Sequence, residues 1–178
     1  MTSVVVLYKS RMGHTARVAR RIRESIVAAG GRCETMEITE ATYEGLDWDA
    51  YDVVVMGAPV IYGTYDKSVF RFIADNQARL ESKPGSFFNV SVVARNAEKA
   101  TVEGNRYMQK FLELSPWRPK DLKVIAGKVD YPSWPWYDTL MIQMIMKMTK
   151  GPTDPTSVID YTDWDDVRAY GEHVLTLA

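Results

Sequence analysis

The chain has little cysteine and little histidine: one cysteine and two histidines among 178 residues. One cysteine cannot form an intrachain disulfide, and a lone thiol favours a reducing compartment, so we expect a cytoplasmic protein. Cys33 falls in an expected strand, where a small buried side chain is the ordinary interpretation. His14 and His173 have no further histidines or cysteines at metal-ligand spacing, so we expect no metal site.

Excess charge and long apolar runs are also lacking. The 22 basic and 23 acidic residues leave a net charge of −1, whereas nucleic-acid-binding proteins usually carry a basic excess, so we expect no nucleic-acid partner. No apolar run reaches the ~20 residues of a membrane-spanning helix. The N-terminus lacks a basic segment leading into an apolar one, so we expect no signal peptide. The Gly-x-Ser-x-Gly motif of many serine hydrolases is missing as well.

Apolar segments of strand length alternate with segments of helical periodicity along the chain. The expected strands are 3–8, 32–38, 52–56, 87–93 and 122–129. The expected helices are 15–29, 66–80, 102–114 and 163–177. This length suits a single domain, residues 1–178. Five strands alternating with helices predict an α/β fold, a three-layer doubly wound sheet of five parallel strands.

Residues 10–15, Ser-Arg-Met-Gly-His-Thr, join the first expected strand to the first expected helix. At such a junction the free N–H groups of the loop and the helix N-terminus form an anion-binding hollow. Ser10 and Thr15 can add hydroxyl donors, and Gly13 permits a turn that a Cβ would obstruct. The motif has neither the Gly-Lys-Ser/Thr ending of the triphosphate loop nor the Gly-x-Gly-x-x-Gly pattern. The loop therefore fits one terminal phosphate, as on FMN, or is an ordinary capped turn.

Two further loops should meet this one, because ligands of doubly wound sheets lie beyond the carboxyl ends of the strands. These loops are 58–63, where the Tyr62 ring can cover a planar ligand, and 94–96. The candidate cofactor-binding residues are thus Ser10, Arg11, Met12, Gly13, His14, Thr15, Ala58, Pro59, Val60, Ile61, Tyr62, Gly63, Ala94, Arg95 and Asn96.

A long connection, residues 131–157, follows the fifth expected strand, and long connections in compact domains are often functional. It contains a helix of about 14 residues, roughly 21 Å long and too short to cross a bilayer. Its expected apolar stripe is Tyr137, Leu140, Met141, Met144, Ile145 and Met148, widened by Ile142 and Met146. Either this insert packs on the domain or in a homodimer, or it contacts a bulky ligand or a membrane surface. Candidates for the second role are Trp134, Trp136, Tyr137, Met141, Met144, Ile145 and Met148.

Several stretches resemble flavodoxin-fold proteins, and more specifically the family of menaquinone-dependent protoporphyrinogen IX dehydrogenases. They are 10–15, 92–95, 115–119, 124–127, 136–138, 145–148 and 161–164. The resemblance implies a flavodoxin-like fold, FMN as cofactor, protoporphyrinogen IX as hydride donor and a menaquinone-type acceptor. It also implies that the 131–157 insert shapes the substrate site and holds the protein to the inner face of the cell membrane. One departure is Met12, where flavodoxins often have a hydroxyl residue.

Arg95 is the charge of most interest, because it lies at the carboxyl end of a strand. It can stabilise an anionic flavin, pair with a substrate propionate or form a surface salt bridge. No general base is identifiable. Two alternatives stay open, a flavodoxin-type electron carrier and an FMN-dependent NAD(P)H:quinone reductase. Carriers are usually strongly acidic, which a net charge of −1 does not match, and no clear nicotinamide site is visible.

Overall fold

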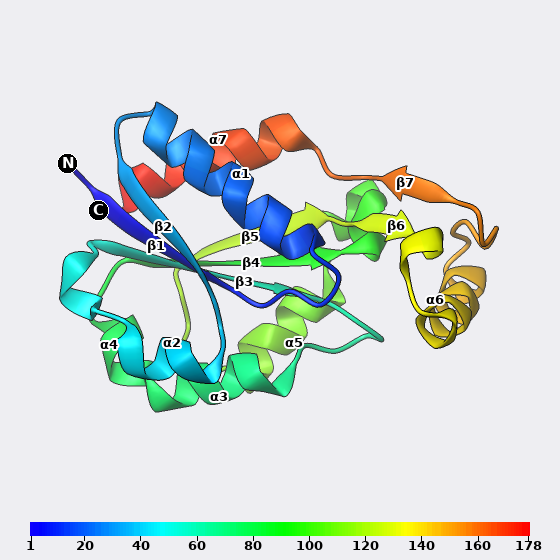
Figure 1. Cartoon of the computed structure of the whole chain (residues 1–178), viewed down its shortest axis with the longest axis horizontal. Coiled ribbons are helices and arrows are strands. Elements are labelled where there is room, and N and C mark those ends of the chain that lie inside the picture. Colours follow the sequence, from blue (N-terminus) through cyan, green and yellow to red (C-terminus); the bar gives the residue numbers. More distant parts are fainter.

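Five parallel strands form the central sheet of the computed structural model (Figure 1), which describes the backbone of residues 1–178 and all side chains except those of 41, 43 and 44. The strands are β1 (Ser3–Tyr8), β2 (Arg32–Glu37), β3 (Val53–Pro59), β4 (Gly85–Ser91) and β5 (Asp121–Ala126). Their order is β2-β1-β3-β4-β5. The chain thus moves outward from β1 in both directions, and the predicted doubly wound α/β sheet is confirmed.

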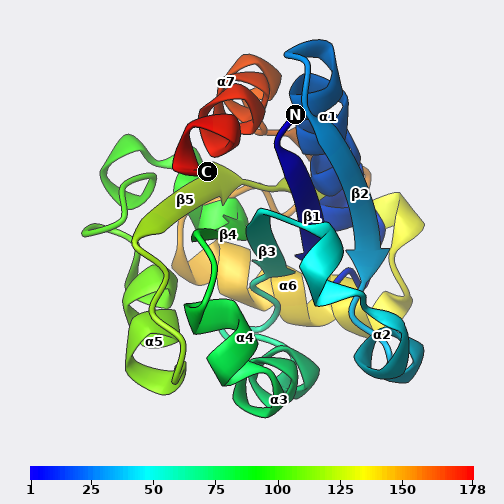
Figure 2. The same cartoon turned by 90° about the vertical axis from the view of Figure 1, so that its left-hand side faces the viewer.

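Helices cover both faces of the sheet (Figures 1 and 2). One face carries α1 (His14–Ala28) and α7 (Trp164–Val174), which continues as a 3-10 turn, Leu175–Leu177. The other carries α2 (Glu40–Gly45), a 3-10 turn at Trp48–Ala50, α3 (Lys67–Asp75), α4 (Gln77–Glu81) and α5 (Arg106–Leu114). Two further 3-10 turns, Val92–Arg95 and Ala97–Lys99, follow β4. Neither α2 nor the Trp48–Ala50 turn was predicted from the sequence.

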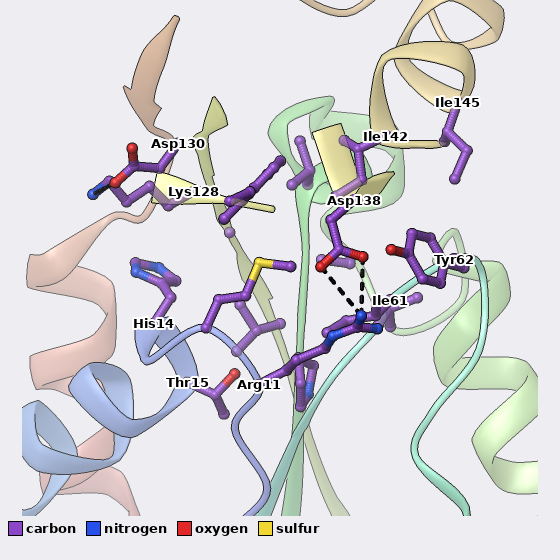
Figure 3. Close-up of a pocket in the computed structure, with 18 of the residues that line it drawn as sticks. Arg11, His14, Thr15, Ile61, Tyr62, Lys128, Asp130, Asp138, Ile142 and Ile145 are labelled. Atoms are coloured by element: carbon purple, nitrogen blue, oxygen red, sulfur yellow. Dashed lines mark hydrogen bonds and ion pairs between the residues drawn. The ribbon is translucent and has the colours of Figure 1, made fainter. Parts of the chain in front are cut away.

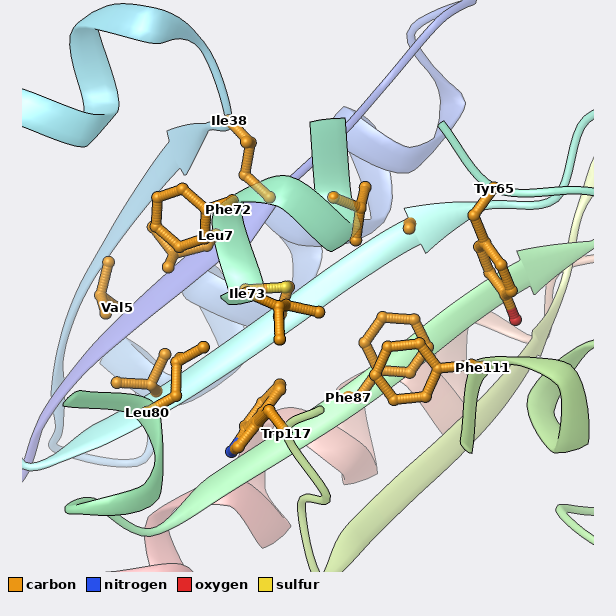
Figure 4. Packing of buried hydrophobic residues seen from close by; sticks show 14 of the residues in the cluster. Val5, Leu7, Ile38, Tyr65, Phe72, Ile73, Leu80, Phe87, Phe111 and Trp117 are labelled. Atoms are coloured by element: carbon orange, nitrogen blue, oxygen red, sulfur yellow. The ribbon is translucent and has the colours of Figure 1, made fainter. Parts of the chain in front are cut away.

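Each face has its own apolar core, because β1, β3 and β4 are covered on both sides and alternate side chains between them. On the α3–α5 side, Phe87 stacks on Phe111 with ring centroids 3.6 Å apart, in the same apolar cluster as Ile73 and Leu80 (Figure 4). On the α1–α7 side, Val4, Val6 and Val55 pack against Ile22. Burial of these apolar side chains on both faces stabilises the sheet. The sheet in turn positions the loops at the carboxyl ends of its strands.

Several predicted boundaries are wrong, including the end of the third strand, which continues beyond residue 56 to Pro59, and the start of the fourth, which is Gly85 rather than 87. The helix expected over 66–80 is two helices, since Asn76 ends α3 and its side-chain amide donates to the Phe72 carbonyl at 3.0 Å. The helix expected from residue 102 begins at Arg106, because Asn105 caps it. The fourth strand ends at Ser91 rather than 93, because the chain turns there into the 3-10 helix Val92–Arg95.

The expected strand 122–129 is divided at Gly127. Up to Ala126 it pairs with β4, and beyond Gly127 it becomes β6 (Lys128–Asp130), which pairs antiparallel with β7 (Val158–Asp160) in a separate two-stranded sheet. Between β6 and β7 lie the 3-10 turn Tyr131–Ser133 and α6 (Trp136–Met148). Figure 1 shows α6 beyond the carboxyl ends of the strands, at the opposite end of the molecule from both termini.

Candidate functional site

A cavity of about 680 Å³ lies beyond the carboxyl ends of β1, β3 and β4. Its main walls are the loop 10–15, the loop 59–63, residues 90–93 and, opposite them, the inner side of α6 (Figure 3). Its size falls within the range of small-molecule sites. Two of the three predicted loops therefore meet at one hollow, and the insert, which the resemblance implied would shape the substrate site, forms one of its walls.

The loop 10–15 has the geometry of an anion cradle. Gly13 has φ 85°, a left-handed conformation that glycine adopts most easily, and α1 begins at the next residue. The first N–H groups of a helix have no acceptor within the helix, and no described side chain caps those of α1. These N–H groups are therefore available to a ligand. The Gly13 N–H donates to Ser10 Oγ at 3.1 Å, and Thr15 is buried beneath the loop. These features suit a bound phosphate better than an ordinary capped turn.

The loop 59–63 forms the second side and holds Tyr62 in an uncommon conformation. Tyr62 has φ 52° and Gly63 has φ 73°, and two backbone hydrogen bonds between Ile61 and Thr64 close the turn. A non-glycine residue in this region is strained and such strain often occurs at ligand sites. The Arg11 guanidinium lies over the Tyr62 ring, 5.2 Å from its centroid. Ala58 is fully buried below the loop and does not line the cavity.

On the third side the structure places different residues from those predicted. Val90, Ser91, Val92 and Val93 line the cavity, whereas residues 94–96 do not. The 3-10 turn Val92–Arg95 carries Ala94 and Arg95 instead to a second hollow of about 460 Å³ along β5. Ser91, which lines the cavity, has a buried hydroxyl with no hydrogen-bond partner among the described residues, so a polar ligand atom could satisfy it.

One end of the cavity is polar, and His14 is held there in a defined state. Thr162 Oγ1 donates to the Ala126 carbonyl at 2.7 Å, so it must accept the 2.8 Å hydrogen bond from His14 Nε2. Nδ1 of the neutral ring is then free to accept. Burial lowers the pKa of His14, with Asp160 opposing this effect and Arg17 and Lys128 adding to it.

Asp160, which follows the insert, ties β7 to the start of α1. It accepts from the Thr162 N–H at 3.0 Å and from Trp164 Nε1 at 3.1 Å, and Arg17 lies 3.8 Å away. Burial opposes ionisation of this carboxyl, but the hydrogen bonds prevail and the pKa of Asp160 is lowered. Arg17 and Lys128 both line the cavity and were not predicted as site residues.

The inner side of α6 takes only part of the predicted apolar stripe and adds one residue outside it. The α6 residues that line the cavity are Tyr137, Asp138, Ile142, Ile145 and Met146, and Asp138, which the prediction did not include, is only 2 % exposed. Arg11 Nη2 donates to both oxygens of Asp138, at 2.9 and 3.1 Å (Figure 3). Sequence reasoning missed this pair because the two residues are 127 positions apart.

The outer side of α6 is apolar and exposed. Six of the ten large exposed hydrophobic side chains found among the described residues belong to α6. Five of them lie on this outer side, Trp136, Leu140, Met141, Met144 and Met148, and the sixth, Tyr137, is exposed but also lines the cavity. Of the seven predicted substrate or membrane residues, Trp134, Tyr137 and Ile145 line the cavity, and the other four face outward. In the described part of the chain, no helix has the length and apolarity needed to span a bilayer, and no cluster of acidic, histidine or cysteine side chains could hold a metal ion.

Taken together, the cavity residues fit FMN. The uncapped start of α1 beside Gly13 suits its phosphate. Tyr62 and the Val92–Val93 segment provide surfaces on two sides for a planar ring. Apolar side chains of α6 lie across the cavity from these segments and would exclude water from a bound flavin ring.

Comparison with known proteins agrees with this geometry. The flavodoxin domain family matches residues 5–156. The protoporphyrinogen IX dehydrogenase [quinone] of Escherichia coli K12 is 36 % identical, over 97 % of this chain and 94 % of its own length. The enzyme of the same name from Leishmania major is 33 % identical, over 97 % of this chain and 74 % of its own.

Among solved structures, a Streptococcus pneumoniae flavodoxin superposes with a TM-score of 0.56 and 10 % identity, covering 99 % of this chain and 100 % of the other. This match supports the fold alone. The family matches establish that the chain is an oxidoreductase with FMN as its cofactor. The chain belongs to the flavodoxin family and, within it, to the family of quinone-linked protoporphyrinogen IX dehydrogenases.

Proposed function

We propose that this protein oxidises protoporphyrinogen IX to protoporphyrin IX and passes the electrons to a menaquinone-type quinone. The observation that carries this proposal is the apolar wall of α6, whose Ile142, Ile145 and Met146 face the FMN-binding loops across one cavity. An electron carrier has no need of such an enclosed apolar space. A large, flat, hydrophobic tetrapyrrole does.

When bound, FMN supplies a two-electron acceptor, so the six-electron conversion of a porphyrinogen to a porphyrin takes three rounds. The chain's own residues bind FMN and orient its ring relative to the substrate. The loop 10–15 holds the phosphate, and Tyr62 with the Val92–Val93 segment sets the plane of the ring. Ile142, Ile145 and Met146 exclude water from the reacting centre and contact the substrate.

The decisive test is an anaerobic steady-state assay of porphyrin fluorescence with FMN-loaded protein and separate acceptors. We expect porphyrin formation with a menaquinone analogue and less with a ubiquinone analogue. Turnover that is equal with both would contradict the choice of menaquinone. No turnover with either would contradict the dehydrogenase. Rapid flavin reduction by NAD(P)H in the same preparation would instead favour a quinone reductase.

We further propose that the exposed outer face of α6 rests on a membrane surface, where menaquinone is dissolved. Trp136 is 75 % exposed and Met148 is 80 % exposed. Lys147 and Lys150 are also exposed near the end of α6, where they could meet anionic lipid headgroups. Burying such side chains in the headgroup region would favour binding in proportion to their apolar area.

Co-sedimentation with vesicles of phosphatidylethanolamine and phosphatidylglycerol tests this contact. We expect wild-type protein to sediment with the vesicles and W136E and M148E to remain largely in the supernatant. Leu114 on α5 is 54 % exposed, so L114E provides a matched control that should bind like wild type. Equal binding by all four proteins would contradict the proposal. So would wild-type protein that stays in the supernatant and forms a dimer in which α6 is buried.

A further inference from the structure

The helix α6 has few attachments to the rest of the molecule. Figure 1 shows it beyond the end of the sheet, outside the two helical layers. Its fully buried apolar residue, Met146, packs in a small cluster with Val129 and Tyr131, and this cluster is separate from the two main cores. The two main cores therefore do not fix how α6 sits over the cavity, and the small cluster contacts it mainly through Met146 and Ile142.

At its first turn, α6 is held by Arg11. The Asp138 carboxylate is 2 % exposed and receives both of its hydrogen bonds from Arg11 Nη2, at 2.9 and 3.1 Å. A buried carboxylate is costly unless it is paired, so this contact favours one placement of the helix N-terminus. Arg11 belongs to the loop that follows β1, and its guanidinium also lies over the Tyr62 ring, 5.2 Å from the ring centroid. The first turn of α6 is thus joined to both cofactor loops.

At its last turn, α6 is held by Arg95. The Arg95 guanidinium donates through Nη2 to the Thr149 carbonyl at 2.9 Å and through Nη1 to the Val92 carbonyl at 3.1 Å. Thr149 is the residue at which α6 ends. A cation is favourable at this end because the last carbonyls carry the negative pole of the helix. Gly151 leaves room for this contact, since a Cβ there would lie 2.8 Å from Arg95 Nη2.

We infer that Arg11 and Arg95 are positioning residues that hold α6 by its two ends and so set the width of the substrate space. Both arise from segments at the carboxyl ends of strands, β1 for Arg11 and β4 for Arg95. The distance between the flavin-binding loops and the Ile142, Ile145 and Met146 wall then depends on two side-chain contacts. This inference rests on the proposed function for the identity of the substrate, but the placement of α6 can be tested without it.

Hydrogen exchange of the FMN-loaded full chain, measured by mass spectrometry, tests the placement. D138N should raise exchange about tenfold or more in the first turns of α6, and R95M should do so in its last turn, matching the range that a charge-assisted hydrogen bond contributes. R95K, which keeps the charge but places its donors on a single nitrogen, should restore part of the protection. E172Q, which removes the 2.8 Å ion pair with Arg168 on α7, should leave α6 unchanged. Unchanged exchange of α6 in D138N and R95M would overturn the inference.

Steady-state kinetics and FMN titration give the second readout. In D138N and R95M we expect the KM for protoporphyrinogen IX to rise about tenfold, the range expected when an interaction that shapes substrate binding is lost, while kcat and the FMN dissociation constant change far less. If FMN affinity falls as much as the KM rises, the two arginines serve the cofactor and the inference is wrong. If D138N does not fold, D138E keeps the charge but displaces it by one methylene and should raise exchange at the same turns. If wild-type protein does not oxidise protoporphyrinogen, the proposed function fails, and the exchange data still decide the role of the two arginines.

Discussion

Gly13 sets the shape of the phosphate loop through a backbone conformation that would destabilise the fold if any other residue adopted it. The backbone there has φ 85°, and a Cβ would meet no atom within 4 Å. G13A should therefore be destabilised only through the backbone, by about 1–2 kcal/mol, which is the cost of a left-handed conformation for an L-residue. Urea denaturation of the FMN-free protein measures this difference. Gly45, where a Cβ also meets nothing within 4 Å, has no positive φ, and G45A should be neutral or stabilising. An equal loss in both variants would contradict the interpretation of Gly13.

His14 makes stability depend on pH. Burial is the largest cause that lowers its pKa below the usual value of 6.5, so the folded protein keeps the ring neutral while the unfolded chain takes up a proton. The unfolded state then binds more protons as pH falls, and stability decreases below about pH 6.5. As the pH falls from 7 to about 5, the unfolding free energy of wild type should therefore decrease relative to that of H14Q. A constant difference, measured by urea denaturation of both FMN-free proteins, would contradict this account.

The residues of the site were predictable where their role depends on the local backbone. The loop 10–15 and the segment 58–63 were identified from glycine, hydroxyl and aromatic residues that follow strands, and the structure places both at the cavity, except for Ala58. Arg95 was expected near the carboxyl end of a strand and lies in the 3-10 turn after β4, but it does not line the cavity and instead donates to the carbonyls of Val92 and Thr149. Asp138 could not be predicted, because its burial depends on Arg11, which is distant in sequence.

At the scale of elements, two helix caps should contribute different amounts to the free energy of unfolding. Asn105 caps α5 by accepting from the N–H groups of Tyr107 and Met108, and it also pairs with Asn89, which is fully buried. N105A should lower the unfolding free energy by about 1 kcal/mol for the cap and a further ~1–3 kcal/mol for the buried Asn89 N–H that loses its acceptor, while the other N–H of that amide keeps its bond to the Tyr65 hydroxyl. Asp66 accepts only from the exposed Ser68 N–H at the start of α3, so D66A should cost about 1 kcal/mol. Equal losses in denaturation experiments would contradict this distinction.

The strands and most helices were predicted because their apolar periodicity is set by the two cores. For α6 the existence of the helix was predicted, but the side that faces inward was not. Apolar residues occupy most of its circumference, so periodicity cannot select the buried side. The two most deeply buried residues of the helix are Met146 and the acidic Asp138, and an acidic residue is not expected on a buried side. The division of the expected fifth strand at Gly127 depends on pairing with β7, which lies about 30 residues later and carries little apolar signal.

At the scale of the whole molecule, FMN should stabilise the fold through the segments that enclose it. A ligand present at about 100 times its dissociation constant adds about 2.7 kcal/mol to the unfolding free energy. Riboflavin has the same ring but no phosphate, so at equal concentration it should raise the melting temperature much less if the loop 10–15 binds the phosphate. Thermal unfolding with each ligand compares them, and equal shifts would show that the loop is not a phosphate site.

The central claim is that protoporphyrinogen IX transfers its electrons to the flavin held between these loops and α6. The most direct measurement mixes FMN-loaded protein with protoporphyrinogen IX under anaerobic conditions, without quinone, and follows flavin absorbance and porphyrin fluorescence together. We predict that the flavin absorbance is lost as porphyrin appears, and that a menaquinone analogue added afterwards restores the absorbance. A flavin that stays oxidised in the presence of protoporphyrinogen, yet is readily bleached by a chemical reductant, would contradict the account.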